Sequence, residues 1–404
     1  MNNDSEQITP VPEVDKIALR YDYLLHASVP KSEYWGITYP DSEGVPHNME
    51  ELRQACLHYK DLSLKEEKYI DSYKKYNYHL AQAEYTSCSE YCHSLSFVVQ
   101  ASRTDVCNLS CKFCRHEPIK NINALSIEIW QQALPELLPS VIEFISYCWG
   151  EPLLDEYFGA TYALARKYRA KVSFITNWQQ VTEQNAETVL RDVQRIFISV
   201  DTVNPDVFEK LRNGGTLEKI ERNLQLLYSI SRRLGLKLPW IGLSVVLTRN
   251  TLPDLPHLIE WAYEKGMMGV SARRVVMREN IERLLADETI DLSSNEYWDI
   301  HHAAVKTAET YRLALNMPVQ LYLDRDDTRC LCPWTHLYMN PEGKLHLCAF
   351  SHRNSLGTVP IQSDFWNSGN LRKARREFLK RPRCSECASL DSVGFTGASQ
   401  MRGY

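Results

Sequence analysis

The sequence lacks any apolar run of about 18 residues, the length that a membrane-spanning helix requires. Its start, MNNDSEQITPVPEVDK, has neither a basic segment nor an apolar one, so a secretory signal peptide is not expected. The net charge of −5 gives no support for binding to nucleic acid or other polyanions. Together these absences predict a cytoplasmic protein without a membrane partner.

Glycine and proline are absent from residues 48–85, which carry many charges and tyrosines and therefore predict one or two amphipathic helices. Cysteine is absent from residues 149–329, although the chain contains 12 cysteines. In a chain without a secretion signal, cysteines gathered toward the two ends are expected to bind metal or take part in catalysis, not to form disulfides. This distribution predicts two separate metal sites.

The chain has 404 residues, of which 44% are hydrophobic and 24% charged, and this is enough for two or three globular domains. From about residue 95, six short apolar runs alternate with helical patterns. This alternation predicts an α/β fold with parallel strands, open or curled into a full or partial barrel, with the chemistry at the C-terminal strand ends. The runs are 96–102, 142–148, 171–177, 195–201, 240–248 and 268–276.

A helix is expected next, over residues 295–316. The cysteine-rich region that follows contains YMNPEGKLHLC, in which two apolar runs flank Pro341-Glu342-Gly343 and predict a β-hairpin. The expected organisation is a helical N-terminal extension (1–94), a barrel (95–300), a small cysteine-rich domain (301–390) and a C-terminal tail (391–404).

Three cysteines, Cys107, Cys111 and Cys114, fall just past the first predicted strand with the spacing C-x3-C-x2-C. Thiolates are soft ligands that suit iron–sulfur clusters or zinc. Three of them can hold three irons of a [4Fe-4S] cube and leave the fourth iron free for a substrate or cofactor. A zinc site completed by His116 is the alternative.

This motif, with Phe113 before its third cysteine, resembles the signature of the radical S-adenosylmethionine (SAM) superfamily. Three further motifs at successive strand ends resemble elements of the same family, although Trp149 stands where the family usually has a second glycine. They are Gly150-Glu151-Pro152, Thr176-Asn177-Trp178 and Ser199-Val200-Asp201. The resemblance covers about residues 95–280.

The resemblance implies a partial (β/α)6 TIM-like barrel in which Cys107, Cys111 and Cys114 hold a [4Fe-4S] cluster and SAM chelates its open iron. It also implies that SAM is contacted by Phe113, Gly150, Glu151, Pro152, Asn177, Ser199 and Asp201. From the residues alone, Ser199 and Asp201 have the alternative role of strand-terminating caps. Glu151 can accept hydrogen bonds from an ammonium group, and Gly150 permits a close backbone approach.

The C-terminal cysteines Cys330, Cys348, Cys384 and Cys387 can converge, because the predicted hairpin brings Cys348 back toward Cys330 and a C-x2-C pair follows. By spacing alone, zinc or a fully ligated iron–sulfur cluster fits equally. The pattern resembles the twitch form of the SPASM extension, which implies one auxiliary [4Fe-4S] cluster, two clusters in all. Cys332 is the alternative to Cys330 as a ligand.

The resemblance implies an enzyme that reductively cleaves SAM to a 5′-deoxyadenosyl radical and abstracts hydrogen from its substrate. An external low-potential donor of the flavodoxin or ferredoxin type would supply the electron. The expected substrate is a small polar metabolite of sugar or aminocyclitol type, with net oxidation aided by the auxiliary cluster. Maturation of a ribosomally made peptide, by cross-linking or epimerisation, is the alternative, and a zinc-stabilised binding protein is the non-enzyme alternative.

No general acid or base is identified. His116, Arg273, Arg274 and Glu279 lie near strand ends, where solvated or ion-paired roles are expected. Cys56, Cys88, Cys92 and Cys148 are expected to be structural, Cys148 as a core residue of its strand.

Overall fold

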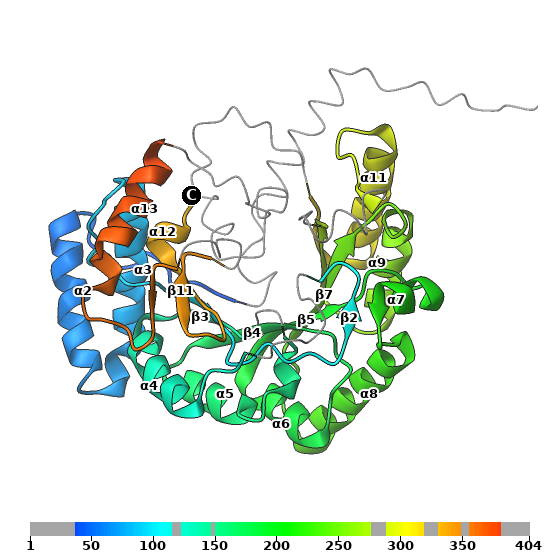
Figure 1. Ribbon diagram of the computed structural model, residues 1–404, viewed down its shortest axis with the longest axis horizontal. Helices are drawn as coiled ribbons and strands as arrows, with labels where there is room; N and C mark the ends of the chain where they lie inside the picture. Colours follow the sequence, from blue (N-terminus) through cyan, green and yellow to red (C-terminus); the bar gives the residue numbers. More distant parts are fainter. Residues whose placement is uncertain are drawn as a thin grey trace, which may run out of the picture.

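A computed structural model describes residues 37–114, 123–146, 150–275, 288–318, 330–348 and 355–380. All six predicted strands are present and lie side by side in chain order in one sheet, each parallel to the next. They are β1 (Val98–Ala101), β3 (Glu143–Ile145), β4 (Lys171–Thr176), β5 (Val193–Ser199), β7 (Trp240–Leu247) and β8 (Gly269–Arg274). The sheet curves into an open arc, which agrees with the predicted partial barrel (Figure 1).

The sheet continues beyond these six strands at both edges. At one edge β9 (Ala314–Asn316) adds to β8 in parallel. At the other edge β10 (His336–Met339) adds to β1 in parallel, and β11 (Lys344–His346) and β12 (Gly357–Thr358) follow antiparallel. The predicted hairpin is thus present, and it extends the barrel sheet to ten strands among the described residues.

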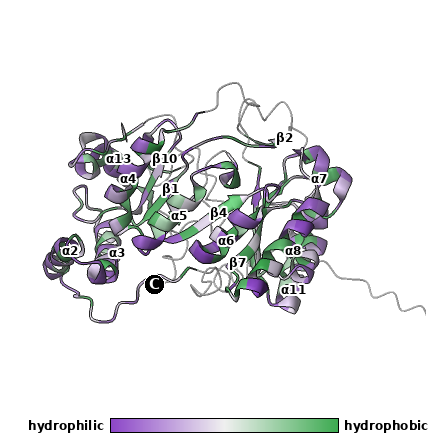
Figure 2. Cartoon of the chain, turned by 90° about the horizontal axis from the view of Figure 1, so that it is seen from below, coloured by the Kyte–Doolittle hydropathy of each residue, from purple (hydrophilic) through white to green (hydrophobic). Residues whose placement is uncertain are grey.

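Helices cover the outer side of the arc, in the places where crossover connections between parallel strands are expected (Figure 1). They bury alternate residues of the strands, such as Ile198, Leu243 and Val270, in one continuous core. The helices are α4 (Ile127–Leu137), α5 (Phe158–Lys167), α6 (Glu183–Asp192), α7 (Pro205–Leu211), α8 (Leu217–Leu234), α9 (Leu255–Glu264) and α11 (Asn295–Tyr311). Figure 2 shows hydrophobic residues concentrated on the strands and polar residues on the outer helices.

The helix boundaries follow local sequence signals. Thr182 begins α6 in a capping box with Asn185, and Thr216 caps the start of α8. Gly235 ends α8 in the left-handed conformation, which glycine adopts without steric cost. These signals explain why the crossovers form locally before they pack on the sheet.

One helix prediction is corrected in detail, and another is confirmed. The segment predicted as one helix over 295–316 is α11 followed by β9, because Arg312 takes a left-handed conformation that ends the helix after Tyr311. The region 48–85 forms two helices, α2 (Met49–Ser63) and α3 (Ile70–Thr86), separated by a short 3-10 turn. Within the described ranges no helix is long and apolar enough to cross a membrane.

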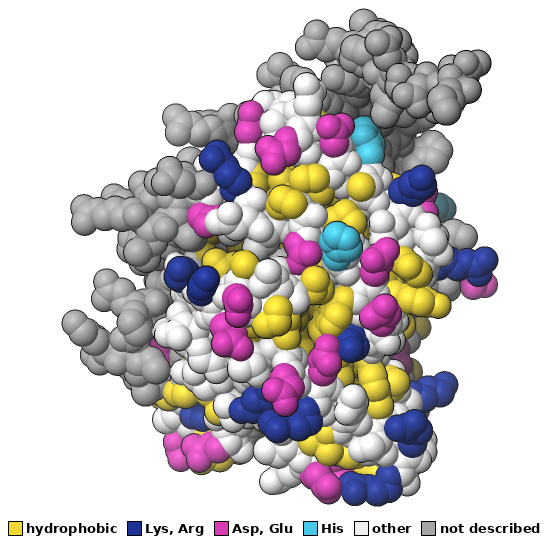
Figure 3. Space-filling model, turned by 90° about the vertical axis from the view of Figure 1, so that its right-hand side faces the viewer, with side chains coloured by type: hydrophobic (Ala, Val, Ile, Leu, Met, Phe, Trp, Pro, Cys, Tyr) yellow, Lys and Arg dark blue, Asp and Glu magenta, His cyan; other side chains and the backbone are white. Residues whose placement is uncertain are grey.

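The face shown in Figure 3 is the side of the molecule where α7, α9 and α11 lie in Figure 1. Acidic and basic side chains alternate there around scattered hydrophobic groups. No single sign of charge dominates this face, in keeping with the modest net charge of the chain.

The inner side of the arc has a layered filling. Its lowest layer is ionic: Glu143 of β3 pairs with Arg195 of β5, and the same carboxylate accepts hydrogen bonds from Ser173 and from the hydroxyl of Tyr39, each at 2.9 Å. The Glu143 carboxylate thus joins β3, β4 and β5 with the residue Tyr39 near their N-terminal ends. This polar network closes the bottom of the barrel.

An apolar layer lies above the ionic one. The indole of Trp240 packs with Phe197 at a ring-centroid distance of 5.2 Å and with Ala314. Gly242 and Gly269 make room for it, because a Cβ on Gly242 would lie 2.4 Å from the indole carbons and one on Gly269 would lie 2.8 Å from them. Trp240 with Phe197 and Ala314 thus forms a floor across the inner side of the sheet, here called the Trp240 floor.

The helix α3 covers the N-terminal ends of the strands. Lys74, only 4% exposed, donates from its Nζ to the backbone oxygens of Val141 and Tyr168, each at 2.5 Å. Burial lowers the pKa of Lys74 to about 7, although a nearby Asp71 carboxylate raises it. A neutral amine still has two N–H groups, which is enough for both carbonyls.

We expect Gly242→Ala to destabilise the protein by about 1–3 kcal/mol, because the new methyl group overlaps Trp240 and the backbone of Gly269. Chemical denaturation of the purified protein measures this change. Gly159→Ala, in α5, is the control. A Cβ at this position would contact only the Thr188 hydroxyl, at 3.7 Å, and alanine is more favourable than glycine inside a helix. Equal stability of the two variants would contradict the packing of the Trp240 floor.

We expect stability to rise with pH through Lys74. Between about pH 7 and 10.5 the unfolded chain keeps the proton of this amine and the folded chain releases it, so the unfolding free energy increases with pH. From pH 7.5 to 9.5 the contribution is about 2 kcal/mol. Urea unfolding at both pH values should show that gain in the wild type and a smaller gain in Lys74→Met. An equal gain in the two proteins would show that Lys74 is not the source of the pH dependence.

Candidate functional site

The three cysteines of the first cluster lie on the loop that leaves the C-terminal end of β1. In the middle of this loop β2 (Ser110–Cys111) pairs antiparallel with β6 (Arg212–Asn213), and the N–H of Lys112 donates to the oxygen of Leu211 at 2.9 Å. Since β6 follows α7, which comes after β5, the pairing holds the cysteine loop across the strand ends. The cysteine loop therefore lies across the C-terminal strand ends, and its role as the ligand of a cluster stays a prediction.

The thiols of the loop interact with one another. Burial raises the pKa of Cys107 to about 11, with smaller contributions from the charges of Glu151, Cys111 and Cys114 and an opposing one from the backbone of Leu109. Burial also raises the pKa of Cys111, while the guanidinium of Arg212 opposes that rise. Metal coordination deprotonates a thiol outright, so these three side chains are suitable ligands for iron.

Among the described residues, no three His, Cys, Asp or Glu side chains are grouped as the ligands of a single metal ion. Thiolates suit both zinc and iron–sulfur clusters. The assignment of Cys107, Cys111 and Cys114 to a four-iron cube therefore stays a prediction.

Arg212 is a residue of the site that the sequence motifs do not reveal. Its Nε and Nη2 donate to the two carboxylate oxygens of Asp201 at 2.6 and 3.0 Å, and its guanidinium lies 5.0 Å from the centre of the Phe113 ring. Its positive charge also interacts with the thiol of Cys111. Burial opposes its charge, yet Asp201 and Cys111 outweigh burial and raise its pKa. The only sequence signal for Arg212 is the helix α7, which begins at a proline and leads the chain back to the C-terminal strand ends.

Glu151 lies beyond β3 and is 2% exposed. Its carboxylate accepts hydrogen bonds from the Thr176 hydroxyl at 2.5 Å, the Asn177 N–H at 2.7 Å and the Leu153 N–H at 3.2 Å. Burial nevertheless raises its pKa to about 7 against these three bonds. The side chain therefore links the loop after β3 to the end of β4.

Gly150 is required by a close contact of two loops. A Cβ at this position would lie 2.7 Å from the oxygen of Val106 and 2.8–2.9 Å from backbone atoms of Asp105. The next residue, Glu151, donates its N–H to the same oxygen of Val106 at 2.7 Å. Pro152 then begins a short 3-10 turn. The glycine thus joins the loop after β3 to the cysteine loop.

Asn177 contacts the cysteine loop directly. Its Nδ2 lies 3.8 Å from the sulfur of Cys107 and donates to the side chain of Asn108 at 2.9 Å. Trp178, the next residue, has a φ of 57° and is fully buried. A left-handed backbone is one that glycine adopts without steric cost and that a residue with a large side chain rarely takes.

Ser199 and Asp201 lie at the end of β5, as predicted. Asp201 is fully buried and, besides the two bonds from Arg212, accepts the N–H of Val246 on β7 at 2.8 Å. Ser199 is 8% exposed, and no hydrogen bond to its hydroxyl is formed within the described part of the chain. Phe113 packs with Val246 and Val275. Asp201 thus stabilises the loop, and Ser199 offers a hydroxyl at the same edge.

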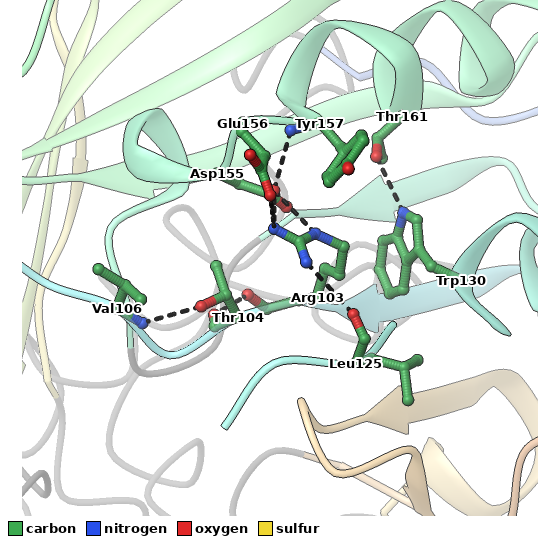
Figure 4. Close-up of polar contacts among 10 residues, drawn as sticks. Arg103, Thr104, Val106, Leu125, Trp130, Asp155, Glu156, Tyr157 and Thr161 are labelled. Atoms are coloured by element: carbon green, nitrogen blue, oxygen red, sulfur yellow. Dashed lines mark hydrogen bonds and ion pairs between the residues drawn. The ribbon is translucent and has the colours of Figure 1, made fainter. Parts of the chain in front are cut away.

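The start of the cysteine loop is fixed by a separate network around Arg103, two residues after β1 (Figure 4). The guanidinium donates twice to one oxygen of Asp155, at 2.8 and 2.6 Å, and once to the oxygen of Leu125 at 3.2 Å. It also lies 4.7 Å from the centre of the Tyr157 ring. The loop is therefore fastened at its start by Arg103 and in its middle by Arg212.

Three C-terminal cysteines come together near the predicted hairpin. Hydrogen bonds to the thiols of Cys330 and Cys348 raise the pKa of Cys332 well above its usual range, and burial adds to this rise. Cys332 begins the short helix α12 (Cys332–Thr335), whose buried Trp334 donates to the oxygen of Ser89 at 2.8 Å. The choice between Cys330 and Cys332 as a ligand remains a prediction, because both thiols lie near Cys348.

Several predicted residues lie outside the described residues, so their places in the site stay predictions. They are His116, Cys148, Trp149, Glu279, Cys384 and Cys387. Of the cysteines assigned to structural roles, Cys56 and Cys92 are buried and Cys88 is half-buried. Arg273 and Arg274 are half-buried at the end of β8 and each has an interaction partner.

Two sequence families match the chain. Residues 102–262 match the Radical SAM superfamily, and residues 330–388 match SPASM, an iron–sulfur cluster-binding domain. The first range spans the cysteine loop and the strand ends from β1 to β7. The second spans all five C-terminal cysteines.

Curated relatives match about half of the chain. A GTP 3′,8-cyclase from Rhizobium etli is 27% identical over 208 residues, which are 48% of this chain and 56% of that protein. A GTP 3′,8-cyclase from Peptoclostridium acidaminophilum is 29% identical over 140 residues, 33% of this chain and 42% of that protein. The chain thus spans only about half the length of these relatives.

Solved structures share the fold at low sequence identity. Streptococcus suis SuiB bound to S-adenosylmethionine has a TM-score of 0.59 and 15% identity over 81% of this chain and 78% of that one. SuiB bound to the precursor peptide SuiA has a TM-score of 0.56 and 14% identity over 80% and 75%. Native anSMEcpe with bound AdoMet has a TM-score of 0.53 and 16% identity over 73% and 87%.

We expect Arg212→Lys to disturb the first cluster, because lysine keeps the charge but cannot make the two-pronged contact with Asp201. Its unfolding free energy should fall by roughly 1–3 kcal/mol. After anaerobic reconstitution, the electron paramagnetic resonance signal of the reduced protein should be weaker and should respond less to SAM. Arg191→Lys, in an exposed ion pair with Glu187, is the control. An unchanged signal in Arg212→Lys would exclude this positioning role.

Proposed function

Since the chain belongs to the radical SAM superfamily and carries a SPASM-type iron–sulfur cluster-binding domain, we propose that it oxidises a small polar metabolite of sugar or aminocyclitol type. It is an enzyme, and its cofactors are a [4Fe-4S] cluster with SAM and further iron–sulfur binding in the C-terminal domain. When bound, the cluster and SAM supply a 5′-deoxyadenosyl radical that removes a hydrogen atom from a C–H bond of the substrate.

Cys107, Cys111 and Cys114 are the proposed ligands of the first cluster. The observation that carries this proposal is the fixed cysteine loop, in which β2 pairs with β6 and Asn177 Nδ2 lies 3.8 Å from the sulfur of Cys107. Hydrogen bonds to cluster sulfurs shift the reduction potential, so Asn177 would also adjust electron uptake. A flavodoxin- or ferredoxin-type protein is the proposed external electron donor.

The proposed contacts of SAM lie around this loop. Ser199 has a hydroxyl without a partner in the described ranges, and Phe113 presents an aromatic ring beside it in the same region. Glu151 is suited to the ammonium group, and Gly150 and Pro152 hold the loop that carries it. Asn177 and Asp201 orient the surrounding backbone, as their hydrogen bonds support.

The auxiliary cluster is proposed to be held by Cys330, Cys348, Cys384 and Cys387, with Cys332 as the alternative to Cys330. The proximity of the thiols of Cys330, Cys332 and Cys348 supports this assignment. A cluster here would lie beside β10, which pairs with β1, and would accept the electron left on the substrate radical. This is the role that makes the net reaction an oxidation.

The choice of a small metabolite is supported by the sequence relatives, which are named as cyclases of GTP, a small polar molecule. A second candidate function is the maturation of a ribosomally made peptide, by cross-linking or epimerisation. It is favoured by the fold shared with SuiB, a structure of which contains its precursor peptide SuiA.

Anaerobic reconstitution tests the proposal. The wild type should bind about eight irons per chain, the content of two four-iron clusters, and should release 5′-deoxyadenosine from SAM under reducing conditions. A variant with alanine at Cys107, Cys111 and Cys114 should keep about four irons per chain and should release no 5′-deoxyadenosine. Cys88→Ala is the control and should behave as the wild type. A colourless zinc protein would overturn the proposal.

The substrate is identified by deuterium transfer. Candidate substrates with deuterium on their C–H bonds are incubated with the reduced enzyme, and the mass of the released 5′-deoxyadenosine is measured. Transfer from a deuterated sugar or aminocyclitol supports the first candidate, and transfer from a deuterated precursor peptide supports the second.

A further inference from the structure

Three polar side chains lie side by side on the inner side of the arc, in the interior of β7 and β8 and at the end of β9. Ser244 of β7 is in register with Ser271 of β8, and Ser271 is in register with Asn316 of β9. They are 6%, 1% and 6% exposed. The neighbouring positions of β7 and β8, Leu243 and Val270, point into the outer core, so alternation places the three polar side chains on the inner side.

This Ser–Ser–Asn row lies directly above the Trp240 floor. Trp240 and Ser244 are on the same face of β7, four residues apart, and Ala314 and Asn316 are on the same face of β9, two residues apart. The row is therefore the first polar layer above an apolar one. Ser199, the SAM-facing hydroxyl proposed above, is in register with Ser244 on its other side.

The hydrogen-bonding capacity of the row is only partly used. The Nδ2 of Asn316 donates to the hydroxyl of Ser271 at 3.2 Å. The hydroxyl of Ser244 and the amide oxygen of Asn316 have no partner within the described residues. Neither atom is among the fully buried polar atoms that lack a partner, so each keeps a small accessible surface. Both therefore face the inner side with donor and acceptor capacity to spare.

The chemistry of the row selects its ligand. Serine hydroxyls and an asparagine amide are uncharged and both donate and accept hydrogen bonds. Arg273, two residues beyond Ser271, already has an interaction partner. An indole below the row provides a flat apolar surface, against which the C–H face of a ring can pack. The combination fits an uncharged ring that carries several hydroxyl groups.

We propose that Ser244, Ser271 and Asn316, above the Trp240 floor, form the subsite that binds the hydroxyl groups of an uncharged polyhydroxylated ring substrate. The inference rests on the proposed function, since it names the residues that would recognise the metabolite. The end of β5, with Ser199, lies at the same level as the row, so a ligand held there is next to the proposed SAM position.

The test measures binding of myo-inositol, an uncharged ring with hydroxyl groups, to the reconstituted enzyme loaded with SAM, by isothermal titration calorimetry. Cyclohexanol and myo-inositol 1-phosphate are the apolar and anionic comparison probes. Binding of myo-inositol should be detectable and tighter than that of either comparison probe. Absent binding of myo-inositol, or equal binding of cyclohexanol, overturns the proposal.

Variants of the Ser–Ser–Asn row test whether its side chains bind myo-inositol. Ser244→Ala combined with Asn316→Ala should weaken myo-inositol binding about tenfold or more, which corresponds to at least about 1.4 kcal/mol. Ser271→Ala alone should weaken it less, because its hydroxyl already has a partner. Ser229→Ala, on the exposed outer side of α8, is the matched control. Unchanged binding in the double variant overturns the proposal.

A second readout separates this inference from the proposed function. Release of 5′-deoxyadenosine from SAM without added substrate is measured on the wild type and on the Ser229→Ala control, and both should release it. If neither protein releases 5′-deoxyadenosine, the proposed function is wrong. If both release it and myo-inositol does not bind, the function stands and the subsite assignment is wrong.

Discussion

The buried ion pair between Asp201 and Arg212 is the interaction on which the site depends. Asp201 follows the end of β5, and Arg212 belongs to β6. The pair therefore connects the large sheet to β6, the strand that pairs with Cys111 of β2. A buried guanidinium is stable only when its donors are used, and here Asp201 accepts two hydrogen bonds from it while Phe113 covers one face. Without the pair, the middle of the cysteine loop would be held across the strand ends mainly by the two-residue ladder of β2 and β6.

The layers inside the arc explain how one sheet serves both stability and chemistry. The ionic layer around Glu143 and Arg195 closes the N-terminal ends of the strands, and Lys74 of α3 fastens the helical extension there. The Trp240 floor separates that layer from the C-terminal ends, where the Ser–Ser–Asn row, Glu151 and the Asp201–Arg212 pair lie. The network below the floor serves stability, whereas the polar side chains above it serve the cysteine loop and the proposed ligand sites.

The sequence predicted the six central strands, the hairpin and the positions of the motifs, because buried parallel strands appear as short apolar runs and each motif follows one of them. It did not predict β9, because the residues of β9 continue the helical pattern of α11. The helix ends only because Arg312 takes a left-handed backbone conformation. Nor did it predict that β10 pairs with β1, since periodicity shows that a segment is a strand and not which strand it joins. Arg212 was missed because its role arises from a long-range contact with Asp201.

Glu151 and Asp201, the two carboxylates of the strand-end motifs, have different roles. Each accepts three hydrogen bonds within the protein, and a carboxylate has about four acceptor sites, so each has room for one more donor. Asp201 has its charge balanced by Arg212, whereas burial leaves Glu151 with a pKa of about 7 and no paired cation in the described ranges. A cation beside Glu151 would favour its ionised form, so the ammonium group of SAM suits Glu151, while Asp201 serves the loop.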